Sequence, residues 1–447
     1  MKLISMISLG CPKNLVDSET ILGILASGGY VVTPSPEDAE IILINTCGFI
    51  APAVREAVET IRYCLQLKAK GSCSCVIVLG CLVSRYGEKR LSQLLPEVDG
   101  WLGVDAAPVV LQYLETILAG EEPLLKVSRD PGEYPRMLST PFYTAYLKIA
   151  EGCSHACSFC LIPRIRGRLQ SKTPEIIYRE AEQLAASGVK ELILVAQDTG
   201  AYGYDLPGKP TLDGILKELV KIDGLHWIRF LYLNPHSLTP ELISTIQEEK
   251  KLCRYLDLPF QHVNRNILRK MGRRGDSYSY LALISNLKAV LPDLALRTTL
   301  MVGYPGEDRE AFEELQTFVC LAEFDRLGVF PYYHEQGSRS SRYSETVSYI
   351  EKRKRAREIM RLQREISRRK NQELVGRNLE VLIEHNLGED IWWGRSYRDI
   401  PEIDPRVIVK GPNLNPGTFV QVQITRAAAY DLIGIIPENE VPVITKG

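Results

Sequence analysis

The sequence lacks the features of a membrane or secreted protein. No apolar run approaches the ~18 uninterrupted residues of a membrane-spanning helix. The opening Met-Lys-Leu-Ile-Ser-Met leads directly into an expected strand and offers no signal-peptide cleavage pattern. Neither sign of charge is in excess, because 54 basic side chains oppose 55 acidic ones, so the total identifies no partner. We expect a cytoplasmic chain with no membrane segment.

The sequence also gives no sign of a disulfide framework, although cysteine is abundant. The chain has 447 residues, 45% hydrophobic and 24% charged, which is typical of a globular protein with about two to four domains. Its eleven cysteines are an odd number, and a chain of this length does not need cross-links. In a reducing compartment, clustered thiols indicate metal binding or catalysis.

Three cysteines form a central cluster. Cys153, Cys157 and Cys160 lie in a CxxxCxxC pattern directly after an alternating strand. Three thiolates within eight residues can hold one iron–sulfur cubane and leave one iron open for a substrate or cofactor. Structural zinc normally takes four protein ligands, so that alternative requires His155 or a distant residue. Buried, inert thiols are the other alternative.

The region after this triplet alternates between strand and helix patterns. Six expected strands cover residues 146–150, 191–197, 227–232, 256–261, 295–302 and 327–332. Expected helices include residues 174–187, 240–249, 278–290 and 309–321. This alternation predicts a parallel sheet curled into an incomplete barrel, with ligands at the C-terminal ends of the strands. The cysteine triplet lies at that edge.

A CxxxCxxC triplet after a first barrel strand resembles the signature of the radical S-adenosylmethionine (radical SAM) enzymes. The resemblance implies that the open iron binds S-adenosylmethionine, which one-electron reduction cleaves to a 5′-deoxyadenosyl radical. It also suggests cofactor contacts at other strand ends, namely Gln197, Asp198, Thr199, Arg297, Gly303 and Gly306. A salt bridge at the barrel lip is the alternative for Arg297, and a simple strand-to-helix turn is the alternative for the two glycines.

The first ~120 residues predict a separate parallel α/β unit with a second cysteine trio. Expected strands at 2–9, 40–45 and 75–79 are each followed by a cysteine, Cys11, Cys47 or Cys81. The ends of parallel strands meet at one sheet edge, so we expect these thiols to converge on a second cluster with an open iron. The alternative is that three small hydrophobic residues happen to end three strands.

The other five cysteines are interpreted as bystanders. Cys64, Cys253 and Cys320 fall in helical or pre-strand patterns and are predicted to be core thiols. Cys73 and Cys75 form a CxC pair before the third strand. That pair lies at the opposite sheet edge from the trio, which argues against a ligand role.

The C-terminal part combines a basic helix with a small β domain. Residues 351–370 carry ten basic and three acidic side chains at helical spacing, which suits a solvated connecting helix or contact with ribosomal or transfer RNA. Five short expected strands follow, at 379–384, 392–396, 406–409, 419–424 and 432–435. They predict a small, closed, antiparallel β-barrel. Residues 373–447 hold eleven acidic and seven basic side chains, which suits a basic protein partner better than phosphates.

The combination of these three parts resembles the radical SAM methylthiotransferases, with a TRAM domain at the C-terminus. Residues 8–19, Ser-Leu-Gly-Cys-Pro-Lys-Asn-Leu-Val-Asp-Ser-Glu, and residues 394–404, Gly-Arg-Ser-Tyr-Arg-Asp-Ile-Pro-Glu-Ile-Asp, are similar to motifs of the RimO-type enzymes. The resemblance implies a methylthio group added to the β-carbon of an aspartate in small-subunit ribosomal protein S-twelve. It implies two 4Fe–4S clusters, S-adenosylmethionine, a reductant and a sulfur donor. Arg398 departs from the small residue often found in the family.

Two other functions remain open from the sequence. One is the same chemistry on a tRNA adenosine, which a basic barrel would have favoured. The other is a non-catalytic iron–sulfur or zinc adaptor. The expected domains are 1–125 for the N-terminal α/β unit, 140–340 for the partial barrel, 341–372 for the basic helix and 373–447 for the TRAM barrel.

Overall fold

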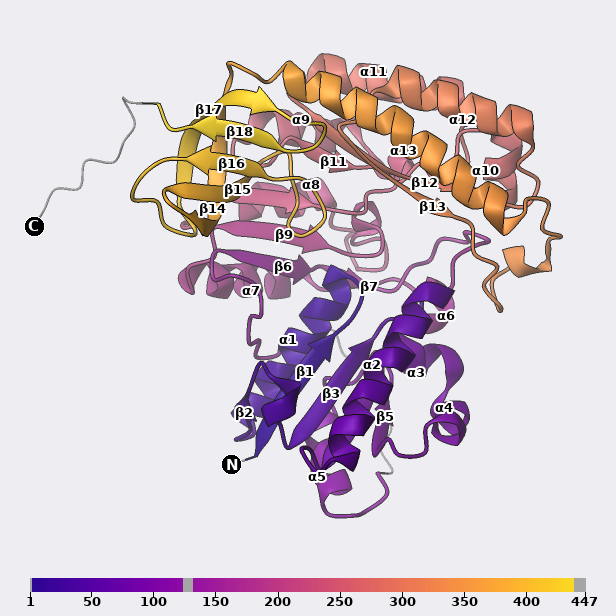
Figure 1. The fold of residues 1–447 in the computed structure, drawn as a ribbon, viewed down its shortest axis with the longest axis vertical. Helices are drawn as coiled ribbons and strands as arrows, with labels where there is room; N and C mark the ends of the chain where they lie inside the picture. The colour runs from indigo at the N-terminus through magenta and orange to yellow at the C-terminus, as the bar shows by residue number, and fades with distance from the viewer. Residues whose placement is uncertain (1, 124–131, 438–447) are drawn as a thin grey trace, which may run out of the picture. The chain divides into compact units, whose positions relative to one another are not determined.

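The computed structural model describes residues 2–123 and 132–437. Its backbone divides into two compact units. The first comprises Met1–Ser187, Ile193–Ile215 and Tyr333–Ser341, and the second comprises Gly188–Leu192, Leu216–Tyr332 and Arg342–Gly447. Figure 1 shows the order of the elements along the chain. Among the described residues, no helix is long and apolar enough to cross a membrane.

The first unit begins with a five-stranded parallel sheet in the order β2-β1-β3-β4-β5. Its strands are β1 (Leu3–Ser8), β2 (Val31–Val32), β3 (Ile41–Thr46), β4 (Cys75–Gly80) and β5 (Gly100–Leu102). Strands β3 and β4 are buried along their whole length, as expected for parallel strands covered on both faces. The three strands predicted from the sequence are thus the core of this sheet.

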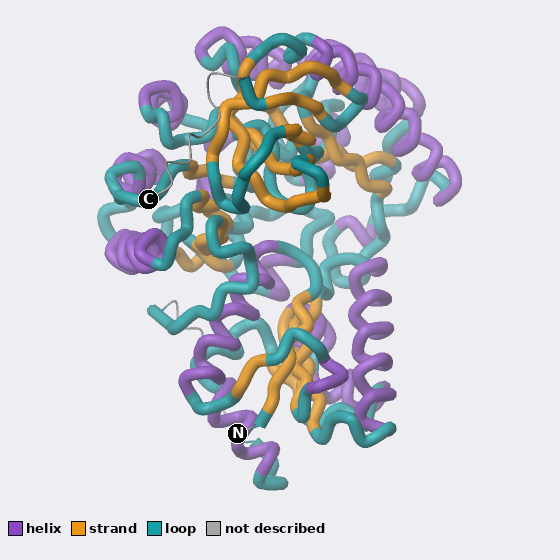
Figure 2. The backbone as a smooth tube through the Cα atoms, turned by 60° about the vertical axis from the view of Figure 1, so that its left-hand side comes forward, coloured by secondary structure: helices purple, strands orange, loops and turns teal. Residues whose placement is uncertain are grey.

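Helices cover both faces of this sheet, as Figure 2 shows. One face packs against α1 (Pro12–Ser27) and α5 (Val110–Leu118) through Leu43 and Ile77. The other face packs against α2 (Ala51–Ala69), α3 (Cys81–Tyr86) and α4 (Glu88–Leu94) through Ile44 and Val78. Successive side chains of a strand point to opposite faces of the sheet. Because both faces are covered by helices, every position of β3 and β4 is apolar or buried.

The rest of the first unit carries the central cysteine triplet. It contains β6 (Thr144–Lys148), β7 (Ala150–Glu151), α6 (Ile162–Ile165), β8 (Gln170–Ser171), α7 (Pro174–Ala186) and most of β9 (Glu191–Val195). The short strands β7 and β8 pair antiparallel and bracket the cysteine loop. The triplet therefore lies beyond β6, where the alternating strand was predicted.

The second unit contains the later strands of the central region. These are β10 (Trp227–Phe230), β11 (Tyr255–Asp257), β12 (Ala295–Val302) and β13 (Arg326–Pro331). Its helices here are α9 (Pro240–Glu248), α10 (Arg265–Met271), α11 (Ser277–Val290) and α12 (Arg309–Ala322), while α8 (Leu212–Leu219) lies across the division. Strands β11, β12 and β13 form a parallel sheet. All six predicted strands exist, but their hydrogen bonding is divided between two three-stranded sheets.

The helix α13 (Tyr349–Gln372) leads into the C-terminal barrel. Ser348 caps its N-terminus by accepting a hydrogen bond from the Glu351 amide. Its inner face buries Ile359 and Ile366, and it packs against β13 and α12. The connecting helix is therefore held along its length by the second unit.

The C-terminal barrel closes in the order β14-β15-β16-β18-β17. Its strands are β14 (Asn378–Gly388), β15 (Ile391–Ser396), β16 (Val407–Lys410), β17 (Phe419–Ala427) and β18 (Leu432–Ile435). The prediction of a wholly antiparallel barrel is wrong at one pair, because β16 and β18 run parallel. Five strands in a closed ring cannot all alternate in direction, so at least one neighbouring pair must be parallel.

The first part of the motif at residues 394–404 is largely buried, whereas Glu402 and Ile403 are exposed. Arg395 donates two hydrogen bonds to Glu191, at 2.5 and 3.0 Å, and both side chains are almost fully buried. Arg398 donates to Asp325 at 2.5 Å, and both of these side chains are also buried. The motif therefore fixes the barrel to Glu191 and Asp325 of this unit, and Arg398 has a structural role.

Candidate functional site

The N-terminal cysteine trio lies at one edge of the parallel sheet. Cys11 follows β1 and is the N-cap of α1, Cys47 follows β3, and Cys81 follows β4 as the first residue of α3. The parallel pairing of β1, β3 and β4 brings these three strand ends side by side. Three cysteines at one sheet edge suit the ligand set of an iron–sulfur cluster.

Close packing and electrostatics place the three thiols together. Gly10 has a φ of +100°, and a Cβ there would lie 2.8 Å from the Cys47 Cβ and 3.3 Å from its Sγ. Burial raises the pKa of Cys47, and Cys11 acts in the same direction. Burial likewise raises the pKa of Cys81 to about 11. The positive charge of Arg166 opposes this rise, whereas Cys11 and Cys47 add to it. Each thiol therefore lies within electrostatic range of the other two.

A layer of amide and hydroxyl side chains holds the three cysteine loops. Asn14 donates to the carbonyl oxygens of Leu9 and Thr46, at 2.8 and 3.1 Å. Asn45 donates to the Asn14 carbonyl at 2.9 Å, and Thr46 donates to the Leu79 carbonyl at 2.7 Å. These bonds connect the ends of β1, β3 and β4. The sequence analysis missed them, because a polar residue beside a strand end has no periodic signal.

The central triplet lies in a loop whose backbone amides face its sulfurs. The Cys153 Sγ accepts from the His155 amide, and the Cys160 Sγ accepts from the Ile162 amide, each at 3.4 Å. The Cys160 amide donates to the Cys157 carbonyl at 3.2 Å. All three thiols are partly exposed. Amide hydrogen bonds to sulfur are a feature of iron–sulfur sites, where they tune the potential, so the loop fits such a cluster.

Glycine is required immediately before the triplet. Gly152 has a φ of +72°, and a Cβ there would lie 2.1 Å from the Arg168 carbonyl oxygen. The next amide, that of Cys153, donates to the Gly167 carbonyl at 3.0 Å. The cysteine loop is thus pinned to the chain that follows it by a close backbone approach that only glycine allows.

The end of β9 reaches the same loop. Asp198 accepts from the ring of His155 at 2.5 Å between Nε2 and Oδ2, and also caps a short turn by accepting from Gly200. Gln197 donates to Glu151 at 2.7 Å, two residues before Cys153. Thr199 is fully buried as the first residue of that turn. Of the predicted candidates after β9, Gln197 and Asp198 therefore contact residues beside or within the cysteine loop.

The other three predicted cofactor residues belong to the second unit. Arg297 lies 3.7 Å from Asp257 and 3.6 Å from Asp404, which is the salt-bridge arrangement considered for it from the sequence. Gly303 donates its amide to Glu307 at 2.8 Å, and a Cβ on Gly303 would lie 2.2 Å from Lys352 of α13. Gly306 similarly faces the Lys270 ammonium, 2.2 Å from the position of an added Cβ.

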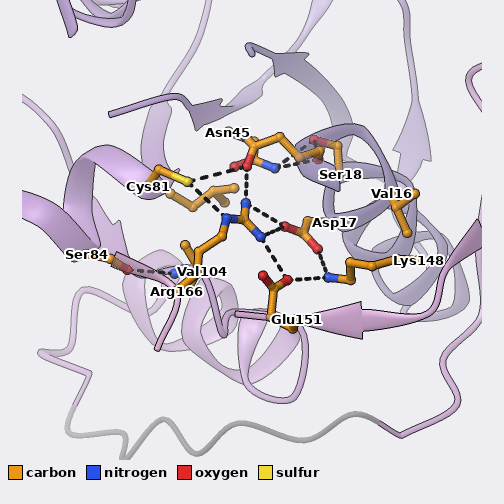
Figure 3. A network of polar contacts seen from close by, with 12 residues as sticks. Val16, Asp17, Ser18, Asn45, Cys81, Ser84, Val104, Lys148, Glu151 and Arg166 are labelled. Carbon is orange, nitrogen blue, oxygen red and sulfur yellow. Dashed lines mark hydrogen bonds and ion pairs between the residues drawn. The ribbon is translucent and has the colours of Figure 1, made fainter. Parts of the chain in front are cut away.

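A buried polar network connects Cys81 of the N-terminal trio to Glu151, two residues before Cys153, as Figure 3 shows. Arg166, whose side chain is 1% exposed, donates its Nε–H to the Cys81 Sγ at 3.2 Å. Its other nitrogens contact Asp17 at 3.1 Å, Glu151 at 2.8 Å and the Asn14 amide oxygen. Sequence reasoning missed Arg166, because an arginine in a loop carries no signal of burial.

The charges of this network cancel, because Arg166 and Lys148 face Asp17 and Glu151. Lys148 contacts Asp17 and lies 2.8 Å from Glu151. Burial alone would raise the pKa of Glu151, but Arg166 and Lys148 outweigh it and hold that pKa well below its usual value. Each buried charge thus has a partner of opposite sign, which is what burial of charge requires. The network fixes the strand that leads to the triplet against α1.

Apolar contacts complete the link between the trios. Cys81 packs in a small buried cluster with Leu161 and Ile165, and Leu161 directly follows Cys160 in the sequence. The two proposed ligand sets therefore lie on facing elements of one compact unit. This proximity could not be predicted from the sequence, because the two trios belong to different strand-and-helix repeats.

Within residues 2–123 and 132–437, no three His, Cys, Asp or Glu side chains converge on one metal-ion position. The three ligands of a cubane bind three different irons, and so they stand further apart than ligands of one zinc ion. The donor sets, with three cysteines each and a histidine ring turned to Asp198, fit clusters better than zinc.

The remaining five cysteines lie outside both trios. Burial raises the pKa values of Cys64, Cys75 and Cys253 to about 12, which keeps these thiols protonated and inert. The prediction that Cys320 is a core thiol is wrong, since it is exposed on α12. A helical pattern alone did not show which face of α12 it occupies.

Comparisons with known proteins cover nearly the whole chain. Residues 3–103 match the uncharacterized protein family UPF0004, residues 147–319 match the radical SAM superfamily, and residues 375–436 match the TRAM domain. The protein named ribosomal protein uS12 methylthiotransferase RimO from Pelotomaculum thermopropionicum is 45% identical, covering 96% of this chain and 98% of that protein. The protein of the same name from Syntrophus aciditrophicus is 46% identical, and the match covers 96% of this chain and 97% of that protein.

A solved structure supports the fold. The radical S-adenosylmethionine methyltransferase TsrM from Kitasatospora setae has a TM-score of 0.55 at 15% identity, covering 74% of this chain and 75% of that one. At this identity the likeness concerns the fold alone. It agrees with the parallel strands and helices described above.

Proposed function

Because the chain belongs to the radical SAM methylthiotransferase family, we propose that it adds a methylthio group to the β-carbon of an aspartate in ribosomal protein uS12. Family membership makes it a transferase that uses S-adenosylmethionine and a 4Fe–4S cluster. The proposal adds the substrate atom, a second 4Fe–4S cluster and the ligands of both. It also assumes an external reductant and a sulfur donor.

The ligand assignment follows the two trios. Cys153, Cys157 and Cys160 hold the cluster that binds S-adenosylmethionine, and Cys11, Cys47 and Cys81 hold the auxiliary cluster. When bound, the first cluster supplies the electron that cleaves S-adenosylmethionine to a radical able to remove a substrate hydrogen. The chain itself positions these groups, and no side-chain acid or base is required.

The observation that carries the proposal is the adjacency of the trios. Cys81 packs against Leu161, the residue after Cys160, and Arg166 connects Cys81 to the network around Glu151. A carbon radical formed beside one cluster can collect sulfur from the other only if the two lie close together. A single-cluster enzyme would not need this arrangement.

Gln197, Asp198 and Thr199 remain the better-supported contacts for S-adenosylmethionine, because two of them touch the cysteine loop. Arg297, Gly303 and Gly306 stay in the proposal with less support, since each has a structural partner within the second unit. The proposed domains keep the boundaries 1–125, 140–340, 341–372 and 373–447, which enclose the three family matches.

The charge of the terminal barrel favours a protein over a tRNA substrate. Residues 373–447 hold eleven acidic and seven basic side chains. Buried ion pairs engage Arg395 and Arg398 among the basic residues and Glu384, Asp399 and Asp404 among the acidic ones. Few cations remain to meet phosphates, whereas an acidic surface attracts a basic protein. Modification of a tRNA adenosine is the alternative.

The test combines metal analysis with cysteine variants. The anaerobically reconstituted chain should contain about eight irons, as two 4Fe–4S clusters require. Replacing Cys153, Cys157 and Cys160 with alanine should remove half of the iron and abolish 5′-deoxyadenosine formation. Replacing Cys11, Cys47 and Cys81 should remove the other half, preserve 5′-deoxyadenosine formation and eliminate sulfur insertion. About four irons in the unaltered chain would contradict the two-cluster proposal.

A further inference from the structure

The outer face of α13 carries an uninterrupted stripe of arginines. Its members are spaced by four, four, three and four residues and are all exposed: Arg353, Arg357, Arg361, Arg364 and Arg368. At about 100° per residue they fall within a sector of about 80°, and at 1.5 Å per residue they span about 22 Å. We call this set the arginine stripe.

The basic residues outside the arginine stripe are neutralised. Arg355 contacts Glu307 at 2.6 Å, Lys352 contacts Glu345 at 2.9 Å and Lys370 contacts Asp325 at 2.8 Å. The remaining two, Lys354 and Arg369, also pair with carboxylates, Glu358 and Glu323. The ten basic residues of this helix thus divide into five that have carboxylate partners and five that form the stripe.

The arginine stripe itself forms no ion pair with any described residue of the protein. The three glutamates of the helix, Glu351, Glu358 and Glu365, lie on a neighbouring sector by the same helical arithmetic. On α12, Glu313 pairs with Arg309 and Glu314 accepts from Asn264. Five unpaired cations therefore face outward in one line.

The geometry of this line points to RNA as the partner. We propose that the arginine stripe binds the phosphate backbone of RNA next to the protein substrate. Guanidinium groups about one helical turn apart suit the repeated charges of a phosphodiester chain. Between Arg353 and Arg368 the stripe sector contains arginine alone. The exposed Tyr349 and Ile350 lie one turn before it, and the Arg353 guanidinium is 5.9 Å from the Tyr349 ring centroid. Because guanidinium groups contact phosphates rather than base edges in this mode, binding should be largely independent of RNA sequence.

This inference deepens the proposed function, because a ribosomal protein in its particle is surrounded by RNA. The two parts of the C-terminal region then have separate tasks. The acidic barrel faces the basic protein, and the basic helix engages the adjacent phosphates. The inference can fail while the proposed function holds, since RNA binding is measured without any methylthiolation.

The experiment compares two variants that each lose five positive charges. The stripe variant changes Arg353, Arg357, Arg361, Arg364 and Arg368 to glutamine, which has a helix propensity close to that of arginine. The control variant changes Arg55, Arg62, Lys70, Lys89 and Arg90, which are also exposed, to glutamine. Far-ultraviolet circular dichroism and the melting temperature establish that both full-length chains are folded.

The measurement is fluorescence anisotropy with a labelled single-stranded RNA of about 20 nucleotides, titrated at several salt concentrations. The unaltered chain should show a logarithmic salt slope of about −3.5, so its affinity falls by about a hundredfold between 50 and 200 mM salt. The stripe variant should lose most of this affinity and slope, while the control variant retains both.

Two results would overturn the inference. Equal losses in the two variants would mean that only net charge matters. Binding of a polyglutamate peptide that requires the stripe, with no such binding of RNA, would assign the surface to an acidic protein. Retention of 5′-deoxyadenosine formation in the stripe variant, measured in parallel, separates loss of RNA binding from damage to the radical chemistry.

Discussion

At the scale of the residue, Gly10 shows how one missing side chain builds a cysteine site. Its φ of +100° and the 2.8 Å approach of an added Cβ to Cys47 leave no room for alanine. We predict that Gly10→Ala displaces Cys47, lowers the free energy of unfolding by about 1–3 kcal/mol and halves the iron content after reconstitution.

Gly29 provides a matched control for this prediction. It also has a positive φ, +90°, but an added Cβ there meets nothing within 4 Å. Gly29→Ala should therefore show the backbone strain alone and keep its full iron content. Equal iron content in both variants would contradict the role assigned to Gly10.

Arg166 is the residue on which the buried network depends. Arg166→Gln would leave Asp17 and Glu151 with Lys148 as the only remaining cation of the network. Because loss of one partner strands buried charge, we expect the free energy of unfolding to fall by about 3–5 kcal/mol. Thermal unfolding, compared with the exposed Arg168→Gln in the same loop, measures this effect.

Arg166→Lys separates charge from hydrogen bonding. The lysine retains a positive charge but cannot reproduce the Nε–H bond to the Cys81 Sγ. Hydrogen bonds to ligand sulfurs raise the reduction potential of iron–sulfur clusters. A redox titration followed by electron paramagnetic resonance should therefore show a lower potential for the auxiliary cluster and an unchanged potential for the other. Unchanged potentials for both would refute the contact.

At the scale of the element, the ion pair between Arg398 of the motif at 394–404 and Asp325 makes the stability of the fold depend on pH. Burial alone would raise the pKa of Asp325, but Arg398 and Lys370 outweigh it and hold that pKa below its usual value. A carboxylate with a lowered folded-state pKa stabilises the fold above its unfolded pKa of about 3.9 and loses this effect as the pH falls.

The variant Asp325→Asn tests whether the charged form of Asp325 stabilises the fold. The variant should be less stable than the unaltered chain near pH 6, by about 3 kcal/mol, because it strands two cations. The difference should shrink as the pH falls through the folded-state pKa, since the unaltered aspartate then also loses its charge. Thermal unfolding at a series of pH values measures it, and a constant difference would contradict the assignment.

The elements also show what the sequence could and could not predict. Apolar runs and alternation correctly predicted the strands that bear Cys11, Cys47 and Cys81, because burial on both faces leaves a direct trace in composition. The same reasoning missed the hydrogen bonds of Asn14 and the burial of Arg166. Those depend on contacts between distant segments, which have no local signal. The prediction of an antiparallel barrel was wrong for the pair β16 and β18. Closing five strands into a ring requires at least one parallel pair, and this requirement is a property of the whole set of strands.

At the scale of the whole molecule, the eleven cysteines and the balanced charge gain separate meanings. Six cysteines are assigned to two proposed ligand trios, which the packing of Cys81 against Leu161 brings near each other. The balanced total charge conceals a basic helix and an acidic barrel. The family was predictable because its motifs are short and local. The adjacency of the trios and the division of the basic helix into paired and unpaired faces required the fold.

The central claim is that this chain modifies ribosomal protein uS12 rather than tRNA. The most direct measurement is the mass of intact uS12, together with tRNA digests, from cells with and without the chain. Replacement of hydrogen by a methylthio group adds about 46 Da. We predict that uS12 becomes lighter by this amount when the chain is absent, while the tRNA nucleosides are unchanged. Loss of the same mass from a tRNA nucleoside, with uS12 unchanged, would contradict the account.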